Sequence, residues 1–193
     1  MMSARMLIVN GSPRKDGSTA TLLEEAGRLA EEAGYSPQRL DLIDMNILPC
    51  HGCLRCKETG QCVLDDDMAK VYGMIEDADF VLMGSPVYFG DSTGLFKTFF
   101  DRWYALLSFS ERKGVLYESR MQTDKKMAFV FPCGNIEGHI LYHGLSIRYT
   151  SNICNLFGLL DVSSTIVPRK KNESDIMKSN QAQEFLTTFR SQL

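Results

Sequence analysis

The chain has 193 residues and a formal net charge of −3, and 44% of its residues are hydrophobic. This near-neutral balance excludes the basic surface typical of a nucleic-acid-binding protein, and no apolar run reaches the roughly 20 residues of a membrane span. Residues 1–10 read as a short strand without a cleavable signal. We therefore expect one cytoplasmic domain over residues 1–193 that binds neither nucleic acid nor membranes.

The hydrophobic pattern predicts strands that alternate with helices along the chain. Short apolar runs predict strands at residues 5–10, 38–42, 79–84, 126–132 and 159–167. Amphipathic segments predict helices at residues 19–33, 65–76, 93–107, 140–157 and about 173–190. Alternation at this spacing is typical of a parallel sheet with helices on both faces, so the expected fold class is α/β.

Two of the predicted helices carry residues that we interpret as structural. Asp65, Asp66 and Asp67 stand at the start of the helix at 65–76, where acidic side chains favour the helix N-terminus. The helix at 93–107 has a stripe of large apolar side chains that is more typical of a core than of a cofactor site. This stripe consists of Phe96, Phe99, Phe100, Trp103 and Leu107.

A compact run of cysteines suggests electron transfer. Cys50, Cys53, Cys56 and Cys62 have the spacing Cys-x2-Cys-x2-Cys-x5-Cys within a predicted loop at 49–63. Crowded thiolates repel one another unless a metal centre shares their charge. Iron–sulfur clusters often take ligands from such a run, whereas structural zinc usually draws two separate cysteine pairs. We expect an iron–sulfur cluster, with zinc or free thiols of a reducing cytoplasm as the alternatives.

The loop after the first strand has the character of a phosphate site. Residues 11–19 are rich in small and hydroxyl side chains and lead into the first helix. Backbone N–H groups at a helix N-terminus bind anions, and hydroxyls add donors. The loop lacks both the Gly-x4-Gly-Lys-Ser/Thr and the Gly-x-Gly-x-x-Gly spacing, which disfavours a nucleoside triphosphate or a dinucleotide. It therefore predicts a site for a monophosphate.

Two further loops follow the third and fourth predicted strands. The run Pro86-Val87-Tyr88-Phe89-Gly90 suits a planar aromatic ligand, because backbone amides can meet ring heteroatoms while apolar side chains contact the ring. A buried hydrophobic loop is the alternative. Cys133-Gly134-Asn135 is expected to complete the pocket wall, or to place Cys133 as a small buried side chain. Cys154 lies in a predicted helix and is interpreted as core.

With these motifs in place, the chain resembles the NADPH-dependent FMN reductase superfamily of flavodoxin-like proteins, and within it the iron–sulfur flavoprotein branch. The resemblance spans about residues 5–165. It rests on residues 11–14 with 17–19, on the cysteine run followed by residues 66–68, and on residues 85–88 with Lys97 and Asp101-Arg102. Ser18 and Asp91 depart from the usual pattern. The resemblance implies a three-layer fold whose five-stranded parallel sheet has the order 2-1-3-4-5.

The same resemblance implies cofactors and their binding residues. The phosphate of FMN would bind Ser12, Arg14, Ser18 and Thr19. The isoalloxazine ring would lie on Pro86, Val87, Tyr88, Phe89 and Gly90, with Cys133 and Gly134 beside it. A [4Fe-4S] cluster would be ligated by Cys50, Cys53, Cys56 and Cys62. Since the cofactors carry the chemistry, we expect no catalytic acid or base in the chain.

These implications lead to a functional hypothesis. We expect an FMN-dependent electron-transfer oxidoreductase that passes electrons between FMN and the cluster, with NAD(P)H as a candidate donor. The alternatives are an NAD(P)H-dependent FMN or quinone reductase without a cluster, a non-enzymatic flavodoxin-like carrier, and a zinc-stabilised oligomerisation loop beside a flavin. The expected partners are copies of the same chain, in a homodimer or homotetramer, and a small electron-carrier protein.

Overall fold

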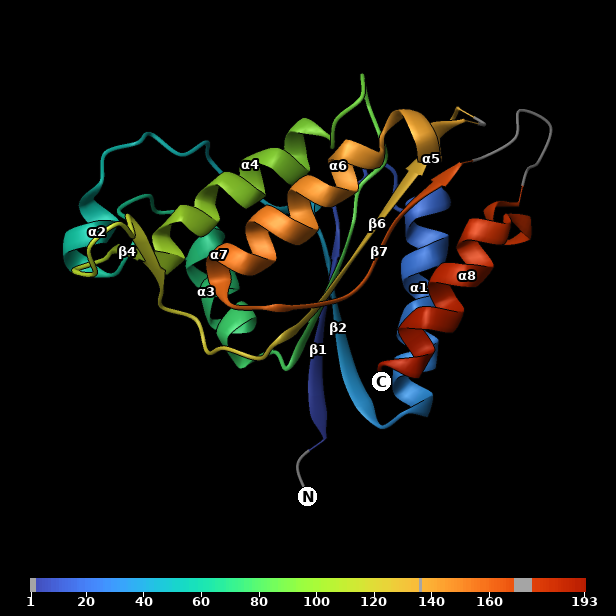
Figure 1. Ribbon diagram of the computed structural model, residues 1–193, viewed down its shortest axis with the longest axis horizontal. Helices are drawn as coiled ribbons and strands as arrows, with labels where there is room; N and C mark the ends of the chain where they lie inside the picture. The colour runs from blue at the N-terminus through green and yellow to red at the C-terminus, as the bar shows by residue number, and fades with distance from the viewer. Residues whose placement is uncertain (1–2, 136, 169–174) are drawn as a thin grey trace.

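The computed structural model describes residues 3–135, 137–168 and 175–193, and its centre is one twisted parallel sheet (Figure 1). Its strands are β1 (Ala4–Asn10), β2 (Tyr35–Asp41), β3 (Phe80–Gly84), β6 (Lys126–Cys133) and β7 (Leu160–Pro168). They lie in the order β2-β1-β3-β6-β7, and each neighbouring pair is parallel. The expected five-stranded sheet is confirmed, because β6 and β7 are its fourth and fifth strands in chain order.

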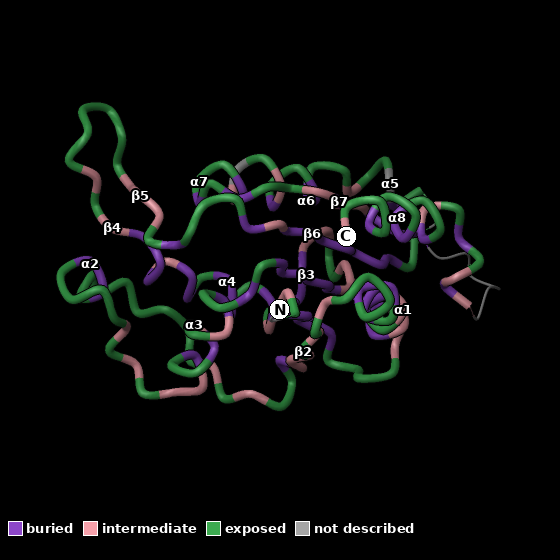
Figure 2. The backbone as a smooth tube through the Cα atoms, turned by 90° about the horizontal axis from the view of Figure 1, so that it is seen from below, coloured by how far each residue is buried: buried purple, intermediate pink, exposed green. Residues whose placement is uncertain are grey.

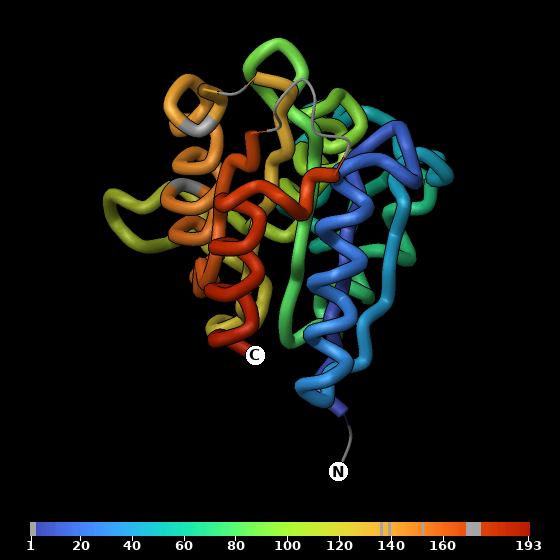
Figure 3. The backbone as a smooth tube through the Cα atoms, turned by 90° about the vertical axis from the view of Figure 1, so that its right-hand side faces the viewer, coloured from blue at the N-terminus to red at the C-terminus, as the bar shows by residue number. Residues whose placement is uncertain are grey.

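Helices cover both faces of this sheet, which gives the expected three layers. The helices α1 (Ser18–Glu32) and α8 (Asn180–Ser191) lie side by side on one face (Figure 3). The other face is covered by α3 (Met68–Asp77), α4 (Gly94–Arg102) and the segment from α6 (His143–Ile147) to α7 (Asn155–Phe157) (Figure 1). Each face has its own buried apolar cluster. Among the helices described, none is long and apolar enough to cross a membrane.

Two predicted helices in the C-terminal part of the chain differ from the structure. The helix expected at 140–157 is divided into α5 (Gly138–Leu141), α6, the π-helical segment η3 (Arg148–Cys154) and α7. The C-terminal helix, expected from about 173, begins at Asn180, and the 3-10 turn η4 (Ile176–Lys178) precedes it. Residues 173 and 174 lie outside the described residues. The 3-10 turn η1 (Leu42–Asp44) follows β2.

A small hairpin is the largest feature that the hydrophobic pattern does not predict. The helix expected at 93–107 ends at Arg102 and is followed by the 3-10 helix η2 (Trp103–Leu106). The strands β4 (Leu107–Phe109) and β5 (Tyr117–Ser119) then pair antiparallel, and their hairpin stands away from the main sheet (Figure 2). Three-residue strands are too short for an alternating pattern to be visible.

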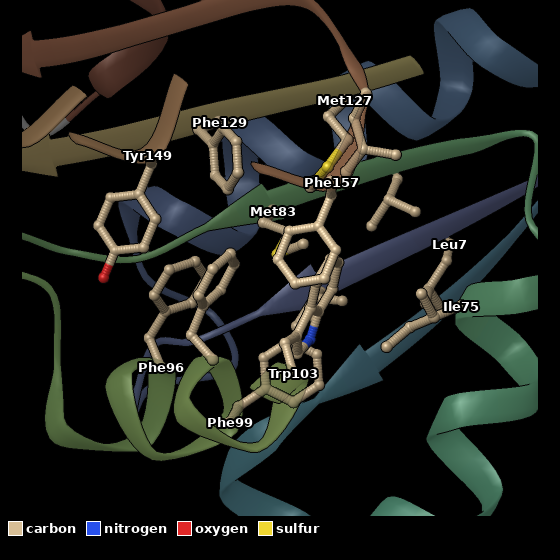
Figure 4. Packing of buried hydrophobic residues seen from close by; sticks show 14 of the residues in the cluster. Leu7, Ile75, Met83, Phe96, Phe99, Trp103, Met127, Phe129, Tyr149 and Phe157 are labelled. Carbon is tan, nitrogen blue, oxygen red and sulfur yellow. The ribbon is translucent and has the colours of Figure 1, made fainter. Parts of the chain in front are cut away.

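The aromatic stripe of α4 lies in the core, as expected. Phe96, Phe99 and Trp103 face the sheet and meet Phe129 and Tyr149 in the cluster of Figure 4. The rings of Phe100 and Trp103 are stacked with centroids 4.9 Å apart. Such pairs contribute about 0.5–1.5 kcal/mol each beyond their buried area. The stripe therefore holds α4 rigidly against the sheet.

Two glycines allow close packing at the carboxyl ends of β1 and β3. The backbone N–H of Gly11 donates to the carbonyl oxygen of Gly84 at 2.7 Å. A Cβ atom on Gly11 would lie 2.6 Å from Cδ2 of Phe96, and one on Gly84 would lie 2.7 Å from Cγ2 of Thr19. Neither position has room for a side chain. The absence of Cβ atoms therefore brings α1 and α4 to the same edge of the sheet.

We predict that Gly11→Ala lowers the free energy of unfolding by about 1–3 kcal/mol, because the added methyl group overpacks the contact with Phe96. Gly73→Ala is the control, since Gly73 lies inside α3 and a Cβ there meets no atom within 4 Å. Alanine at that position should stabilise the protein by up to about 1 kcal/mol. Urea unfolding measures both changes, and equal stability of the two variants would contradict the packing argument.

Candidate functional site

The loop between β1 and α1 is turned by its own side chains. The side chain of Asn10 accepts from the backbone N–H of Ser12 at 3.1 Å, and Oγ of Ser12 accepts from the N–H of Arg14 at 3.1 Å. Asn10 is itself held, because its Nδ2 donates to Asp41 at 2.7 Å. Asn10 and Ser12 are buried, and Arg14 is exposed. The loop thus has a fixed path that leads Arg14 over the start of α1.

The start of α1 combines free backbone donors with a positive charge. Gly17 is the N-cap residue, and no side chain among the described residues caps the helix. The guanidinium of Arg14 lies over this end, with Nε 3.3 Å from the position of a Cβ on Gly17. Ser18 is half-buried in the first turn, whereas Thr19 is buried with its methyl group toward Gly84. Uncapped N–H groups beside a guanidinium are suited to an anion.

Hydrogen bonds join the second loop (residues 85–94) to the first loop (residues 11–19) and to the third loop (residues 133–135). Oγ1 of Thr93 donates to the carbonyl oxygen of Gly11 at 2.6 Å. Oγ1 of Thr93 also caps α4, because it accepts from the N–H of Phe96 at 3.1 Å. The N–H of Val87 donates to the carbonyl oxygen of Pro132 at 2.9 Å. The structure therefore brings all three predicted loops to one edge of the sheet.

The tip of the second loop is strained and exposed. Tyr88 and Asp91 exchange backbone hydrogen bonds of 2.8 and 3.1 Å around a two-residue turn. Phe89 and Gly90 form this turn with φ of +51° and +80°. A left-handed conformation is costly for a bulky residue such as Phe89 and is found mainly at functional sites. The side chain of Phe89 is fully exposed, while Asp91 pairs with Arg148 at 2.9 Å.

The third loop is packed under α5. Cys133 is buried, and burial raises the pKa of its thiol, which donates weakly to the carbonyl oxygen of Asn135 at 3.4 Å. The thiol is directed toward Gly138, where a Cβ would lie 2.0 Å from the sulfur. Gly134 is exposed. The Cys133 side chain is therefore used in packing against α5.

The four clustered cysteines line one pocket. Residues 49–63 are not a loop throughout, because the short helix α2 (Arg55–Thr59) lies within them. Three residues with positive φ, namely Gly52, Leu54 and Gly60, bend the chain around the pocket. All four sulfur-bearing residues, Cys50, Cys53, Cys56 and Cys62, contribute to its wall. The pocket is partly open and has a cavity volume of about 20 Å³.

The cysteines differ in exposure, and all of them are free thiols. Cys50 and Cys53 are exposed, Cys62 is half-buried and Cys56 is buried. Burial raises the pKa of Cys56, and the neighbouring Lys57 partly offsets this effect. Within the described ranges, no three Cys, His, Asp or Glu side chains are arranged around a single metal ion.

A buried ion pair closes the inner side of this pocket. The guanidinium of Arg102 pairs with the carboxylate of Asp66, and their side chains are 1% and 0% exposed. Nη1 also donates to the carbonyl oxygen of Leu48 at 2.9 Å, and Nη2 donates to Sγ of Cys62 at 3.3 Å. Burial raises the pKa of Asp66, but Arg102 and the N–H groups of Leu48 and Met68 outweigh it and hold the pKa below its usual value.

Two further cations anchor α2 to neighbouring elements. Nζ of Lys57 donates to the carbonyl oxygens of Tyr104 and Leu107, and it lies 3.5 Å from the centre of the Tyr104 ring. Burial lowers the pKa of Lys57. Arg120, which follows β5, donates to the carbonyl oxygen of Cys56 at 2.8 Å and to that of Lys57 at 3.2 Å. The hairpin and η2 thus hold the cysteine segment in place.

The helix α4 separates the two groups of predicted site residues. Thr93 at its start contacts the first loop, and Arg102 at its end contacts the cysteine pocket. Nine residues at 1.5 Å per residue give a separation of about 14 Å along the helix. The roles of Lys57, Arg102 and Arg120 in the pocket were not predicted. Lys97, Asp101 and Arg102 are all charged and lie within residues 96–103, so charge in this stretch does not single out Arg102.

Comparison with known proteins identifies the family. Residues 4–146 match the model of the family described as NADPH-dependent FMN reductase. An iron-sulfur flavoprotein of Methanocaldococcus jannaschii is 37% identical over 98 residues, which cover 51% of this chain and 51% of that protein. An iron-sulfur flavoprotein of Clostridioides difficile is 36% identical over 105 residues, or 52% and 46% of the two chains. The chain thus spans about half the length of these curated relatives.

Solved structures share the whole fold. An NAD(P)H:quinone oxidoreductase from Methanothermobacter marburgensis superposes with a TM-score of 0.70 and is 18% identical, and the match covers 98% of this chain and 97% of that one. At this identity the likeness demonstrates the flavodoxin-like fold alone. The family match covers most of the chain and agrees with the motifs of the three loops. The protein therefore belongs to the NADPH-dependent FMN reductase family.

Proposed function

We propose that the protein is an FMN-dependent oxidoreductase that passes electrons between FMN and a [4Fe-4S] cluster. The observation that carries this proposal is the convergence of Cys50, Cys53, Cys56 and Cys62 on one pocket. The names of the curated relatives, which are iron-sulfur flavoproteins, support it. FMN exchanges one or two electrons and the cluster exchanges one, so together they link a hydride donor such as NAD(P)H to single-electron partners.

The first two loops fit FMN. The uncapped start of α1 and the guanidinium of Arg14 suit its phosphate, with the hydroxyls of Ser12, Ser18 and Thr19 as further donors. The segment from Pro86 to Gly90 suits the isoalloxazine ring. Hydrogen bonds hold its backbone at both ends, and its exposed tip has a strained backbone at Phe89. Gly134 would approach the ring through its backbone, and Cys133 would support this wall from beneath.

The cysteine pocket fits an iron–sulfur cluster in its donor set. Four thiols come from one segment, and the segment bends at glycines with open space around them, Gly52 and Gly60. Lys57 and Arg120 would offset the negative charge of four thiolates, and Arg102 would donate a hydrogen bond to Cys62. The chain would provide binding and orientation, and no residue is assigned as a general acid or base.

The phosphate assignment is tested with Arg14→Gln. Loss of a hydrogen bond to a charged partner costs about 1.5–3 kcal/mol, so the affinity for FMN should fall at least tenfold. Riboflavin lacks the phosphate, and its affinity should stay the same. Arg28→Gln is the control, because Arg28 is exposed on α1 and pairs with Glu25 and Glu32. Titration of flavin fluorescence measures the affinities of the wild type and both variants for FMN and for riboflavin, and an equal loss for the two flavins in Arg14→Gln would refute the assignment.

The cluster assignment is tested by metal analysis and cysteine variants. Anaerobically reconstituted protein should hold about four iron and four sulfide per chain. Cys62→Ala should remove or destabilise the cluster and leave FMN bound, because the phosphate loop lies at the other end of α4. Cys154→Ala is the control, since this thiol is buried in η3 and burial raises its pKa to about 12.

Metal content also separates the alternatives. About one zinc and no iron in the reconstituted protein would favour a zinc-stabilised segment beside a flavin. A protein that holds no metal, and whose flavin is bleached by NADPH, would be an FMN or quinone reductase without a cluster. A flavin that no pyridine nucleotide reduces would indicate a flavodoxin-like carrier. The first two results would overturn the electron relay, and the third would exclude NAD(P)H as the electron donor.

We further propose that the chain forms a homodimer or homotetramer through the second loop and the cysteine segment, and that a small electron-carrier protein is its redox partner. Tyr88 and Phe89 expose apolar surface at the mouth of the flavin site. Light scattering at micromolar concentration should show at least a dimer, and Phe89→Ser should weaken it. Leu160→Ser is the control, because Leu160 is exposed at the opposite edge of the sheet. A monomeric wild type would contradict self-association.

A further inference from the structure

The hydrogen bonds of the cations around the cysteine pocket distinguish one residue from the others. Lys57 and Arg120 donate to backbone carbonyl oxygens, and so their role is to hold α2 in place. Arg102 differs, because Nη2 donates to Sγ of Cys62 at 3.3 Å. Among the described hydrogen bonds, this is the one contact from a cationic side chain to any of the four clustered sulfurs.

Arg102 also has a buried donor without a hydrogen-bond partner among the described residues. Its side chain lines the cysteine pocket and is 1% exposed. Nη1 and Nη2 are used by Asp66, Leu48 and Cys62, whereas Nε is buried and has no hydrogen-bond partner among the described residues. A buried, unpaired donor on a guanidinium is costly and calls for an acceptor. Sulfur atoms of a cluster would be acceptors at this wall.

The charge of Arg102 is largely balanced by Asp66. The carboxylate is fully buried and receives further hydrogen bonds from Leu48 and Met68, which favour its ionised form. The pair is therefore close to neutral as a unit, with its donor end directed toward Cys62. Its effect on the pocket comes from a directed hydrogen bond more than from net charge. Such bonds to ligating sulfur are among the factors that set cluster potentials.

Resting on the proposed function, we propose that Arg102 is a positioning residue that orients Cys62 and raises the reduction potential of the [4Fe-4S] cluster. A reduced cluster carries one more negative charge than the oxidised form, so a hydrogen bond to its ligand stabilises the reduced form more strongly. Asp66 acts one step further out by orienting the guanidinium. The reduction potential of the cluster thus depends on a residue at the C-terminal end of α4.

The test is the midpoint potential of the cluster in Arg102→Lys, measured by anaerobic titration with EPR detection. Lysine keeps the charge and can pair with Asp66, but it lacks the second arm that reaches Cys62. The equilibrium constant for cluster reduction should fall at least tenfold, which corresponds to about 59 mV for one electron. Arg112→Gln is the matched control, because it removes an exposed cation from the hairpin that pairs with Glu118 and donates to none of the four clustered sulfurs. Its effect should be less than threefold.

A second variant and a spectroscopic measurement keep the test decisive if Arg102→Lys does not fold. The double variant Asp66→Asn/Arg102→Gln replaces the ion pair by a neutral hydrogen-bonded pair and should lower the potential in the same direction. In the wild-type protein with ¹⁵N-labelled arginine, pulsed EPR of the reduced cluster should detect coupling to a guanidinium nitrogen. This coupling should be absent from the double variant and present in Arg112→Gln.

The outcomes distinguish this inference from the proposed function. A wild-type protein that binds no iron after reconstitution overturns both. A wild-type protein with full iron and sulfide content overturns the role of Arg102 alone in either of two cases. In one case, the equilibrium constants for cluster reduction in the Arg102 variants lie within threefold of the wild-type value. The other is that no arginine nitrogen couples to the cluster.

Discussion

The buried pair of Arg102 and Asp66 is the interaction on which the cysteine region depends. It joins the end of α4 to the segment before α3, and through Leu48 and Cys62 it holds both ends of the cysteine run. Both charges are removed from water, which is costly unless every donor and acceptor is satisfied. Removing one partner of such a pair typically costs about 3–5 kcal/mol. The fold therefore places a large penalty on any rearrangement at this point.

The rigidity of α4 connects this pair to the flavin side of the molecule. The helix is fixed at its start by Thr93, along its length by aromatic packing, and at its end by Arg102. Gly11, directly after β1, lets it approach the first loop closely. A single short helix thereby sets the spacing between the two proposed cofactor sites. Neither site can move along this direction independently of the other.

Most of the sheet could be predicted from the sequence, because its buried strands are apolar runs bounded by glycine and proline. The hairpin of β4 and β5 could not, since three-residue strands with polar members carry no periodicity. The helix expected at 140–157 kept its apolar face but changes from α to π geometry at η3, which periodicity cannot resolve. Asp66 does bond the first turn of α3, yet its main partner, Arg102, is distant in sequence. Ion pairs of this kind depend on tertiary structure.

The link between Arg120 and α2 has an evolutionary consequence. The hairpin and the cysteine segment both lie outside the five-stranded sheet, and Arg120 joins one to the other through the carbonyl groups of Cys56 and Lys57. A descendant that lost the hairpin would keep the thiols but lose the hydrogen bonds of Arg120 that hold α2 in place. A descendant that lost the cysteine segment would keep a hairpin whose Arg120 no longer had these carbonyl partners. The hairpin and the cysteine segment are therefore expected to be inherited, and lost, together.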